Sequence, residues 1–215
     1  GYDFAGWEVS GEESKIENNI FTMGKGGASL KATWSAKSYT ITYNCNGGSG
    51  STSSSSHTYG VAKNLSSNGC YKITEGTSGM LYSFAGWSTN SSASTATYAD
   101  GQSVSGVGSG ANVTLYAIWK NYFSYTGSYN VISDGSGNWR IKLLSSGTLN
   151  INYATTIDLF LVGGGGGSER LAGAGGGYTR TIKSILTEAN SSKEIVVGKG
   201  GAYQSAGGES SAWGY

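Results

Sequence analysis

The sequence predicts a mainly β fold, and three observations support this prediction. Glycine (37 residues) and serine (35 residues) together make up about a third of the 215-residue chain, which provides many turn positions. Aromatic residues make up 12%, too many for a disordered linker, so the turns must connect packed segments. Two sequence blocks also recur along the chain, which is typical of tandem modules.

The recurring blocks lie in the first 121 residues. Residues 2–7 (Tyr-Asp-Phe-Ala-Gly-Trp) return at 82–87 (Tyr-Ser-Phe-Ala-Gly-Trp) with five of six positions identical. A second block, residues 28–34, aligns with residues 113–119, and both copies end in tryptophan. The two tryptophans of a copy are 27 residues apart in the first copy (34 − 7) and 32 in the second (119 − 87). A surface loop can absorb this difference, so both copies are predicted to share one fold.

Alternating side chains predict the strands of these copies. Residues 28–34 alternate apolar and polar side chains, so one face is predicted to be buried. Residues 113–119 are apolar or large on both faces, and both faces are predicted to be covered. Residues 39–44 also alternate, whereas the serine-rich run 51–56 predicts a flexible loop. The predicted core anchors are the four tryptophans of the two copies, Trp7, Trp34, Trp87 and Trp119.

Three blocks of the second copy carry a family resemblance: Phe84-Ala85-Gly86-Trp87, Tyr98-Ala99-Asp100-Gly101 and residues 113–119. With them, this copy resembles the internalin B-type repeat, a small β-grasp-like module strung in tandem along bacterial surface proteins. The resemblance implies a complete repeat at 38–121 and the C-terminal half of another at 1–37. The first copy departs from the family pattern at Lys31, where the pattern has tyrosine. The resemblance to this repeat implies a spacer or adhesive role and no catalytic residues.

The C-terminal part is rich in glycine, with 15 glycines in residues 163–215. Strand-like pieces flank the glycine runs on both sides. Because glycine has no Cβ, backbones can approach closely, and we expect ordered turns and close-packed extended glycine segments rather than a flexible linker. The strand-like pieces are 139–144, 148–152, 157–162, 178–185 and 195–197.

Further blocks carry a second resemblance: residues 134–142, 146–149, 158–167, 175–178 and 207–214. They resemble the glycine-rich domain near the tips of phage tail proteins and in some bacterial surface proteins. This implies a β-sandwich-like domain over residues 122–215, truncated at its C-terminal end, that attaches to a host or neighbouring surface. Exposed rings beside the glycine runs can stack on sugars or fill partner pockets. The candidate ligand-binding residues are Tyr178, Tyr203, Trp213 and Tyr215.

Metal and cofactor sites are not predicted. The chain has two cysteines, Cys45 and Cys70, and one histidine, His57, so it lacks the ligands of a structural zinc site. The cysteines can form a disulfide or remain two separate buried thiols. Residues 134–138 place oxygen side chains at alternate positions, but no acidic residue follows to complete a calcium loop. Residues 198–201 follow a strand but lack the spacing of a phosphate-binding loop, so no cofactor is expected.

Catalytic groups are also not predicted. His57 follows the serine-rich run and is expected to be a solvated loop residue. Glu12 and Glu13 are adjacent and would point apart on a strand, so they do not form the carboxylate pair of a glycosidase. The net charge of +1 excludes the phosphate-neutralising surface of a nucleic-acid-binding protein. The longest apolar run, 157–162, is too short to span a membrane and contains an aspartate.

The sequence therefore favours a non-enzymatic adhesion or receptor-binding segment of a longer extracellular protein. The repeats would act as spacers and the glycine-rich domain as the contact surface, on a bacterial cell surface or a virion tail. The expected partner is a protein or glycan receptor on a host cell or a bacterial surface. A self-assembling structural spacer, in which glycine segments would pack between chains of a homo-oligomer, is the alternative. A polysaccharide-cleaving enzyme is the third hypothesis.

Overall fold

Hydrogen-bonded strands dominate the computed structural model, which describes residues 1–168 and 175–215. Within these residues, helical structure is limited to one short 3-10 turn, η1 (Gly108–Gly110). The prediction of a mainly β fold is therefore confirmed. Contacts divide the chain into two compact units. Unit 1 comprises residues 1–46, 50–69 and 86–118, and unit 2 comprises residues 47–49, 70–85 and 119–215.

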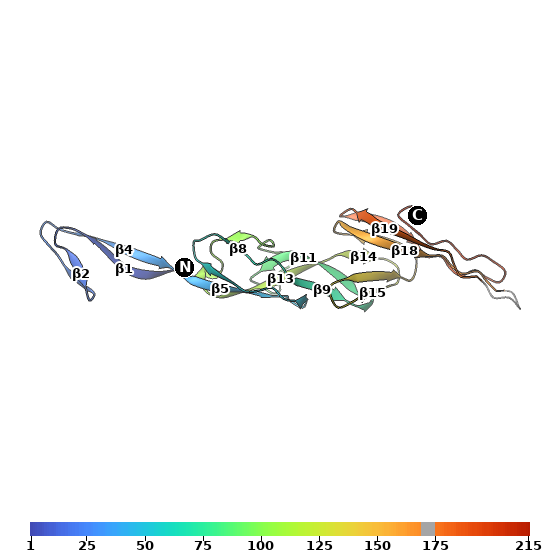
Figure 1. Cartoon of the computed structure of the whole chain (residues 1–215), viewed down its shortest axis with the longest axis horizontal. Helices are drawn as coiled ribbons and strands as arrows, with labels where there is room; N and C mark the ends of the chain where they lie inside the picture. The colour runs from blue at the N-terminus through green and yellow to red at the C-terminus, as the bar shows by residue number, and fades with distance from the viewer. Residues whose placement is uncertain (169–174) are drawn as a thin grey trace. The chain divides into compact units, whose positions relative to one another are not determined.

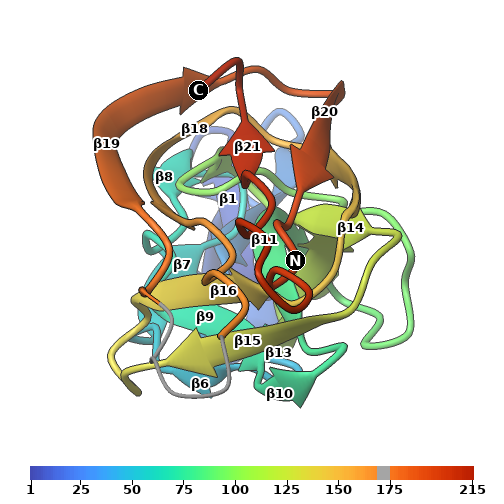
Figure 2. The ribbon, with the colours of Figure 1, turned by 90° about the vertical axis from the view of Figure 1, so that its right-hand side faces the viewer.

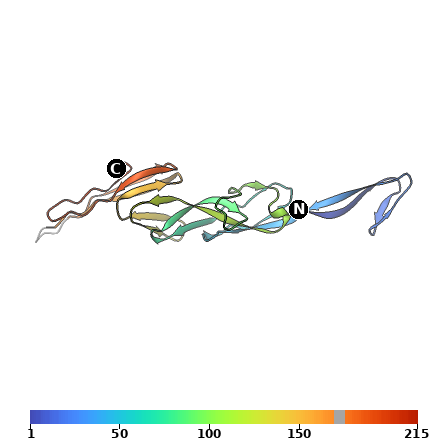
Figure 3. The same cartoon turned by 180° about the vertical axis from the view of Figure 1, so that it is seen from behind.

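The first copy of the repeated blocks folds as a hairpin in unit 1. Strands β1 (Tyr2–Ser10) and β4 (Ser29–Ala36) pair antiparallel and lie side by side (Figures 1 and 3, blue). The connection between them carries a smaller hairpin of β2 (Lys15–Glu17) and β3 (Ile20–Thr22). Phe4 lies opposite Trp34, and the register shifts between Phe4 and Gly6, whose φ of 130° a residue with a side chain rarely adopts.

The second copy forms the core of unit 1. Strand β13 (Val113–Asn121) contains the second block of this copy, and it pairs parallel with β5 (Ser38–Asn44). Strand β5 in turn pairs antiparallel with β7 (Ser55–Thr58). A small two-stranded sheet of β8 (Lys63–Asn64) and β12 (Ser103–Val104) completes this unit. In β13, Leu115, Ala117 and Ile118 are all buried, which confirms the prediction that both faces of this strand are covered. The loop predicted at 51–56 is wrong at its end, because Ser55 already belongs to β7.

The four predicted tryptophan anchors do not share one environment. Trp87 is fully buried and Trp119 is partly buried. Trp7 and Trp34 are 52% and 61% exposed, so their predicted burial is wrong. The reason is that β1 and β4 form a sheet of only two strands, and within the described residues no further strand extends it.

Unit 2 contains two sheets and a long hairpin. Strand β15 (Tyr129–Ser133) pairs with β10 (Gly76–Thr77) and β16 (Trp139–Leu143), while β17 (Gly147–Ile151) pairs with β14 (Phe123–Tyr125) and β20 (Ser191–Val196). Strand β15 lies beside β16, and β18 (Thr155–Val162) lies beside β19 (Thr179–Thr187) in the long hairpin (Figure 2). The remaining strands are β6 (Ser49–Gly50), β9 (Cys70–Thr74), β11 (Met80–Ser88) and β21 (Ser211–Ala212).

Both sheets of unit 2 contribute to one hydrophobic cluster. Val131 comes from the three-stranded sheet β10-β15-β16, and Ile151 and Ile195 come from the four-stranded sheet β14-β17-β20-β21. The five strands predicted between residues 139 and 197 correspond to β16 through β20, with boundaries shifted by a few residues. A further, six-stranded sheet has the order β6-β9-β11-β13-β5-β7. The predicted domain ranges 1–37, 38–121 and 122–215 stay predictions, because the two units are built from discontinuous segments.

The sequence left open whether the cysteines form a disulfide. In the structure, both Cys45 and Cys70 are disulfide-bonded. The Cys45 disulfide sulfur also lies 3.4 Å from the backbone oxygen of Gly50.

Candidate functional site

The predicted contact tyrosines lie on the surface of unit 2. Tyr178 immediately precedes β19 and is 82% exposed, and Tyr203 follows β20 in the next glycine-rich segment and is 61% exposed. Tyr215 is 43% exposed, and the Arg180 guanidinium lies 5.1 Å from its ring centroid. A cation at this distance from a ring is attracted to the π face and helps to hold the ring in place.

Trp213 differs from these tyrosines. It follows β21 and packs against the hydrophobic cluster of unit 2. Its indole Nε1 is buried and has no hydrogen-bond partner among the described residues. Its backbone φ of 52° lies in the left-handed region, which a residue with a large side chain rarely adopts. Trp213 is therefore a core residue of this unit, and the structure does not place it with the exposed rings.

Three glycine-rich segments, residues 163–168, 175–178 and 198–208, run together in what we call the glycine bundle. Backbone hydrogen bonds join them: Gly163 N–H donates to Tyr178 O at 2.9 Å, and Gly164 N–H donates to Gly208 O at 2.9 Å. Gly201 N–H donates to the carbonyl of Gly165 at 2.8 Å. Each segment is thus tied to another by its main chain, so the predicted ordered glycine segments are confirmed for the described residues.

The bundle is too tight for side chains. A Cβ added to Gly164 would meet the Lys199 carbonyl, and one added to Gly177 would meet the Gly163 carbonyl, both well inside 3.0 Å, a distance that real Cβ atoms essentially never show. In contrast, a Cβ added to Gly175 or Gly176 would meet no atom within 4 Å. Backbone atoms cannot move aside as a flexible side chain can, so these interior positions require glycine. The other glycines blocked by backbone atoms within the bundle are Gly167, Gly198, Gly201 and Gly207.

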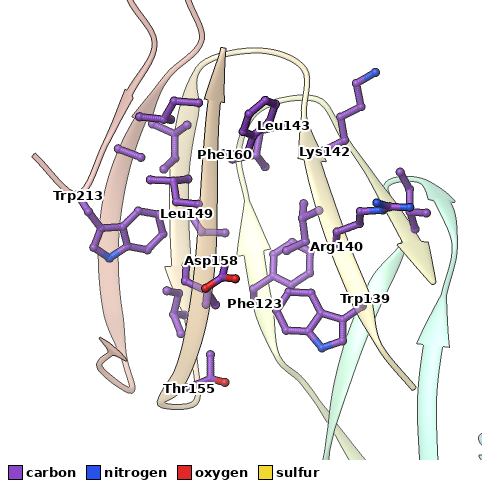
Figure 4. Close-up of a pocket in the computed structure, with 18 of the residues that line it drawn as sticks. Phe123, Trp139, Arg140, Lys142, Leu143, Leu149, Thr155, Asp158, Phe160 and Trp213 are labelled. Carbon is purple, nitrogen blue, oxygen red and sulfur yellow. The ribbon is translucent and has the colours of Figure 1, made fainter. Parts of the chain in front are cut away.

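Unit 2 also contains an apolar cavity of about 1080 Å³. Strands β16 and β18 line it together with residues of β14, β17, β20 and β21. Figure 4 shows Trp213 and Leu149 toward one side of the cavity, and Phe160 and Leu143 also line it. In the same view, the charged side chains of β16, Arg140 and Lys142, extend away from the apolar centre.

The one carboxylate that lines this cavity has a structural partner. Asp158 Oδ1 accepts a hydrogen bond of 2.9 Å from the backbone N–H of Ser184, next to the register shift between Ile157 and Leu159. The carboxylate therefore stabilises the irregular pairing of β18 with β19. The other residues that line the cavity are mainly apolar. The cavity therefore suits contact with apolar groups rather than acid–base chemistry.

His57 is buried, so the prediction of a solvated loop histidine is wrong. It lies on β7 with 2% exposure and stacks on Tyr39 of the neighbouring strand. Its Nε2 lies 2.9 Å from Ser55 Oγ, while its Nδ1 has no partner among the described residues. Burial lowers the pKa of His57 from its ordinary value of 6.5, and the positive charge of Lys63 lowers this pKa further. The Ser55–His57 contact is therefore a hydrogen bond within β7 that involves a buried imidazole.

The oxygen-rich loop at residues 134–138 is satisfied internally. Asp134 Oδ1 accepts hydrogen bonds from Ser136 N–H (2.9 Å) and Oγ (2.8 Å), and Oδ2 accepts one from Asn138 Nδ2 (2.7 Å). These bonds favour the ionised form and lower the pKa of Asp134 from 3.8 to about 2, the Asn138 bond having the largest effect. The loop is a hydrogen-bonded turn. Among the described residues, no group of three or more histidine, cysteine, aspartate or glutamate residues could hold a metal ion.

Comparison with known families adds information on the second copy. Residues 39–118 match the Listeria-Bacteroides repeat domain. This match lies within the predicted complete repeat at 38–121 and includes β5, β7 and most of β13. The match supports a bacterial surface repeat over these residues, does not single out the internalin B type, and does not extend into the glycine-rich residues. A repeat of this kind indicates a segment of an extracellular or cell-surface protein.

No curated protein and no solved structure matches the chain significantly. In the part of the chain that the structure describes, no helix has the length and apolar character needed to cross a membrane.

Proposed function

We propose that this chain is a non-enzymatic adhesion segment of a larger extracellular protein. In this proposal the internalin B-type repeat is a spacer, and the glycine-rich domain at residues 122–215 is the contact surface. The partner is a protein or glycan receptor on a host cell or a bacterial surface. The match of residues 39–118 to a bacterial surface repeat supports an extracellular or cell-surface location. The location that we propose is a bacterial cell surface or a virion tail.

The observation that carries the proposal is the glycine bundle with its exposed tyrosines. The main-chain bonds from Gly163 to Tyr178 and from Gly164 to Gly208 hold the backbone in a fixed position beside Tyr178. Rings on a fixed backbone lose little conformational entropy when they contact a partner, and tyrosine has both an apolar face and a hydroxyl group. Tyr178 and Tyr203, which are mostly exposed, are therefore the residues that we assign to receptor contact.

Binding of the full chain to whole bacterial and host cells tests this proposal. We expect the double variant Tyr178→Ala/Tyr203→Ala to bind cells at least about tenfold more weakly, because two ring contacts are removed. Tyr2→Ala is the matched control, since Tyr2 is also about half exposed but lies in β1 of unit 1. Equal binding by the double variant and the control would exclude the tyrosines as contact residues.

Self-assembly is a second candidate function, and one observation favours it. The β1–β4 hairpin leaves Phe4, Trp7 and Trp34 about half exposed on one face. Contiguous apolar surface of this kind often marks an interface between proteins. Analytical ultracentrifugation separates the two candidates: a monomer that binds cells supports adhesion, whereas a concentration-dependent oligomer lost in Trp34→Ser supports a spacer assembled through this face.

A further inference from the structure

A second hollow of unit 2 combines aromatic rings with amide side chains. It has a volume of about 590 Å³ and is lined by residues from three distant parts of the chain. The end of β13 contributes Trp119, Lys120 and Asn121, and the residues that follow β17 contribute Asn152 and Tyr153. The turn between β19 and β20 contributes Asn190. We call these six residues the amide cleft.

Ring contacts and main-chain bonds hold the walls of the amide cleft. Trp119 meets the edge of Phe84 with ring centroids 5.7 Å apart, and Tyr153 lies against Tyr122 with centroids 6.0 Å apart. Asn152 N–H donates to Tyr122 O at 3.0 Å, which fixes the backbone beside Tyr153. The rings are therefore positioned before any ligand arrives, which lowers the entropy cost of binding.

The amides leave hydrogen-bonding groups available in this cleft. Asn152 Nδ2 donates to the backbone oxygen of Asn121 at 2.8 Å, which orients the amide of Asn152 and leaves its Oδ1 as an acceptor. The side chains of Asn121 and Asn190 make no hydrogen bond within the described residues. Each amide offers both donors and acceptors. Asn190 has a φ of 55°, a left-handed conformation that asparagine tolerates and that fixes the turn from which its side chain extends.

We propose that the amide cleft binds a neutral saccharide. Sugar hydroxyls need donors and acceptors side by side, as three asparagines supply, and the apolar C–H face of a sugar ring packs on an aromatic ring. No carboxylate lines the cleft, so its lining suits neither a cation nor the paired acids of a glycosidase. The lining also contains one lysine, Lys120, so an acidic sugar is the competing ligand class in the test below. The hollow is largely open to solvent, so a sugar can reach its lining residues.

This inference narrows the glycan partner of the adhesion proposal to a neutral saccharide and places its binding at a surface separate from the glycine bundle. The adhesion proposal and the saccharide proposal can fail independently. Cells can be bound through Tyr178 and Tyr203 without the amide cleft, and a sugar can bind in the cleft of a chain that does not adhere to cells. The experiment below therefore measures sugar binding directly, on the full chain.

A glycan array followed by NMR titration tests the amide cleft. The labelled full chain is titrated with lactose, cellobiose, N,N′-diacetylchitobiose, the best neutral glycan of the array and digalacturonate as the acidic probe. We expect at least one neutral sugar to shift the side-chain amide signals of Asn121, Asn152 and Asn190. Binding of digalacturonate alone would overturn the neutral assignment, and an absence of shifts at these amides with every probe would overturn the site.

Two pairs of variants locate the binding. Tyr153→Ala is expected to weaken binding of the sugar about tenfold, whereas Tyr2→Ala, which removes a half-exposed ring in β1 of unit 1, leaves it unchanged. Asn190→Gly keeps the left-handed turn but removes the amide, and it is expected to weaken binding severalfold. Asn19→Gly is the matched control, since Asn19 has a φ of 63° in the β2–β3 turn. Unchanged binding in both Tyr153→Ala and Asn190→Gly would exclude the amide cleft, and each folded state is checked by its amide spectrum.

Discussion

The imidazole of His57 stacks on the phenol ring of Tyr39, with ring centroids 5.6 Å apart and planes 27° from parallel. The two residues face each other across the antiparallel pair of β5 and β7. Both are almost completely buried, and only Nε2 of the imidazole has a partner among the described residues, the Ser55 hydroxyl. An imidazolium at this position would lack solvation on Nδ1 and would face the positive charge of Lys63. The folded chain therefore favours neutral His57.

His57 makes the stability of the fold depend on pH. Its pKa in the folded state is lower than the ordinary value of 6.5, so below pH 6.5 the unfolded chain binds a proton that the folded chain does not. The free energy of unfolding is expected to fall as the pH decreases from 7.5 to 5.5. His57→Phe keeps a ring on Tyr39 and is expected to remove this dependence, and Lys63→Met is expected to reduce it. Urea unfolding at pH 7.5 and pH 5.5 measures this change in the free energy of unfolding. An equal change in His57→Phe and in the unmodified chain would contradict the role of His57, because His57 is the chain's one histidine.

Alanine at an interior glycine of the bundle should destabilise unit 2, whereas alanine at an open glycine should not. In Gly164→Ala the new Cβ meets the Lys199 carbonyl, and separating the two segments is expected to cost about 1–3 kcal/mol. Gly175→Ala is the control, because its Cβ meets no atom within 4 Å, and an effect within about 0.5 kcal/mol is expected. Thermal unfolding, together with amide exchange of Gly201 and Gly208, measures the effects of both substitutions. Rapid exchange of these two amides in the unmodified chain would show that the bundle is not ordered.

The repeated blocks were good predictors of strands and poor predictors of burial. Alternation predicted a strand in each copy, and the structure has β4 and β13 at these positions. Burial depends on what covers that face, which a short pattern does not contain. Leu115 of the second copy is fully buried, whereas Leu30, its counterpart in the first copy, is 44% exposed because no strand extends the two-stranded sheet.

Local composition also misled the prediction for His57 and could not reveal the amide cleft. A serine-rich run normally indicates a loop, yet β7 begins at Ser55 because pairing with β5 outweighs the weak strand preference of serine. The amide cleft joins residues near 120, 152 and 190, and only the pairing of β17 with its neighbours brings such distant positions together. The glycine runs were predictable because close backbone packing leaves a compositional signal in the sequence itself.

The two copies should respond differently to loss of the same tryptophan type. Trp87→Ala is expected to cost about 3–5 kcal/mol, because Trp87 is fully buried and its ring lies 4.9 Å from that of Tyr43, so a large cavity would form. Trp34→Ala is expected to cost less than about 1 kcal/mol, because Trp34 is 61% exposed. Urea unfolding followed by circular dichroism gives both values. Similar losses in the two variants would mean that the first copy is covered in solution.

The disulfide-bonded cysteines should contribute substantially to stability. Cys45 and Cys70 are 25 residues apart in the sequence, and closing a loop of this length in the unfolded chain is expected to stabilise the fold by about 3 kcal/mol. The double variant Cys45→Ser/Cys70→Ser is therefore expected to unfold at lower urea than the oxidised chain. The oxidised chain treated with dithiothreitol is the matched control, and it should unfold like the double variant, since reduction also removes the cross-link but keeps both side chains. If reduction leaves the urea midpoint unchanged while the double variant loses stability, the packing of the cysteine side chains, rather than the cross-link, is responsible.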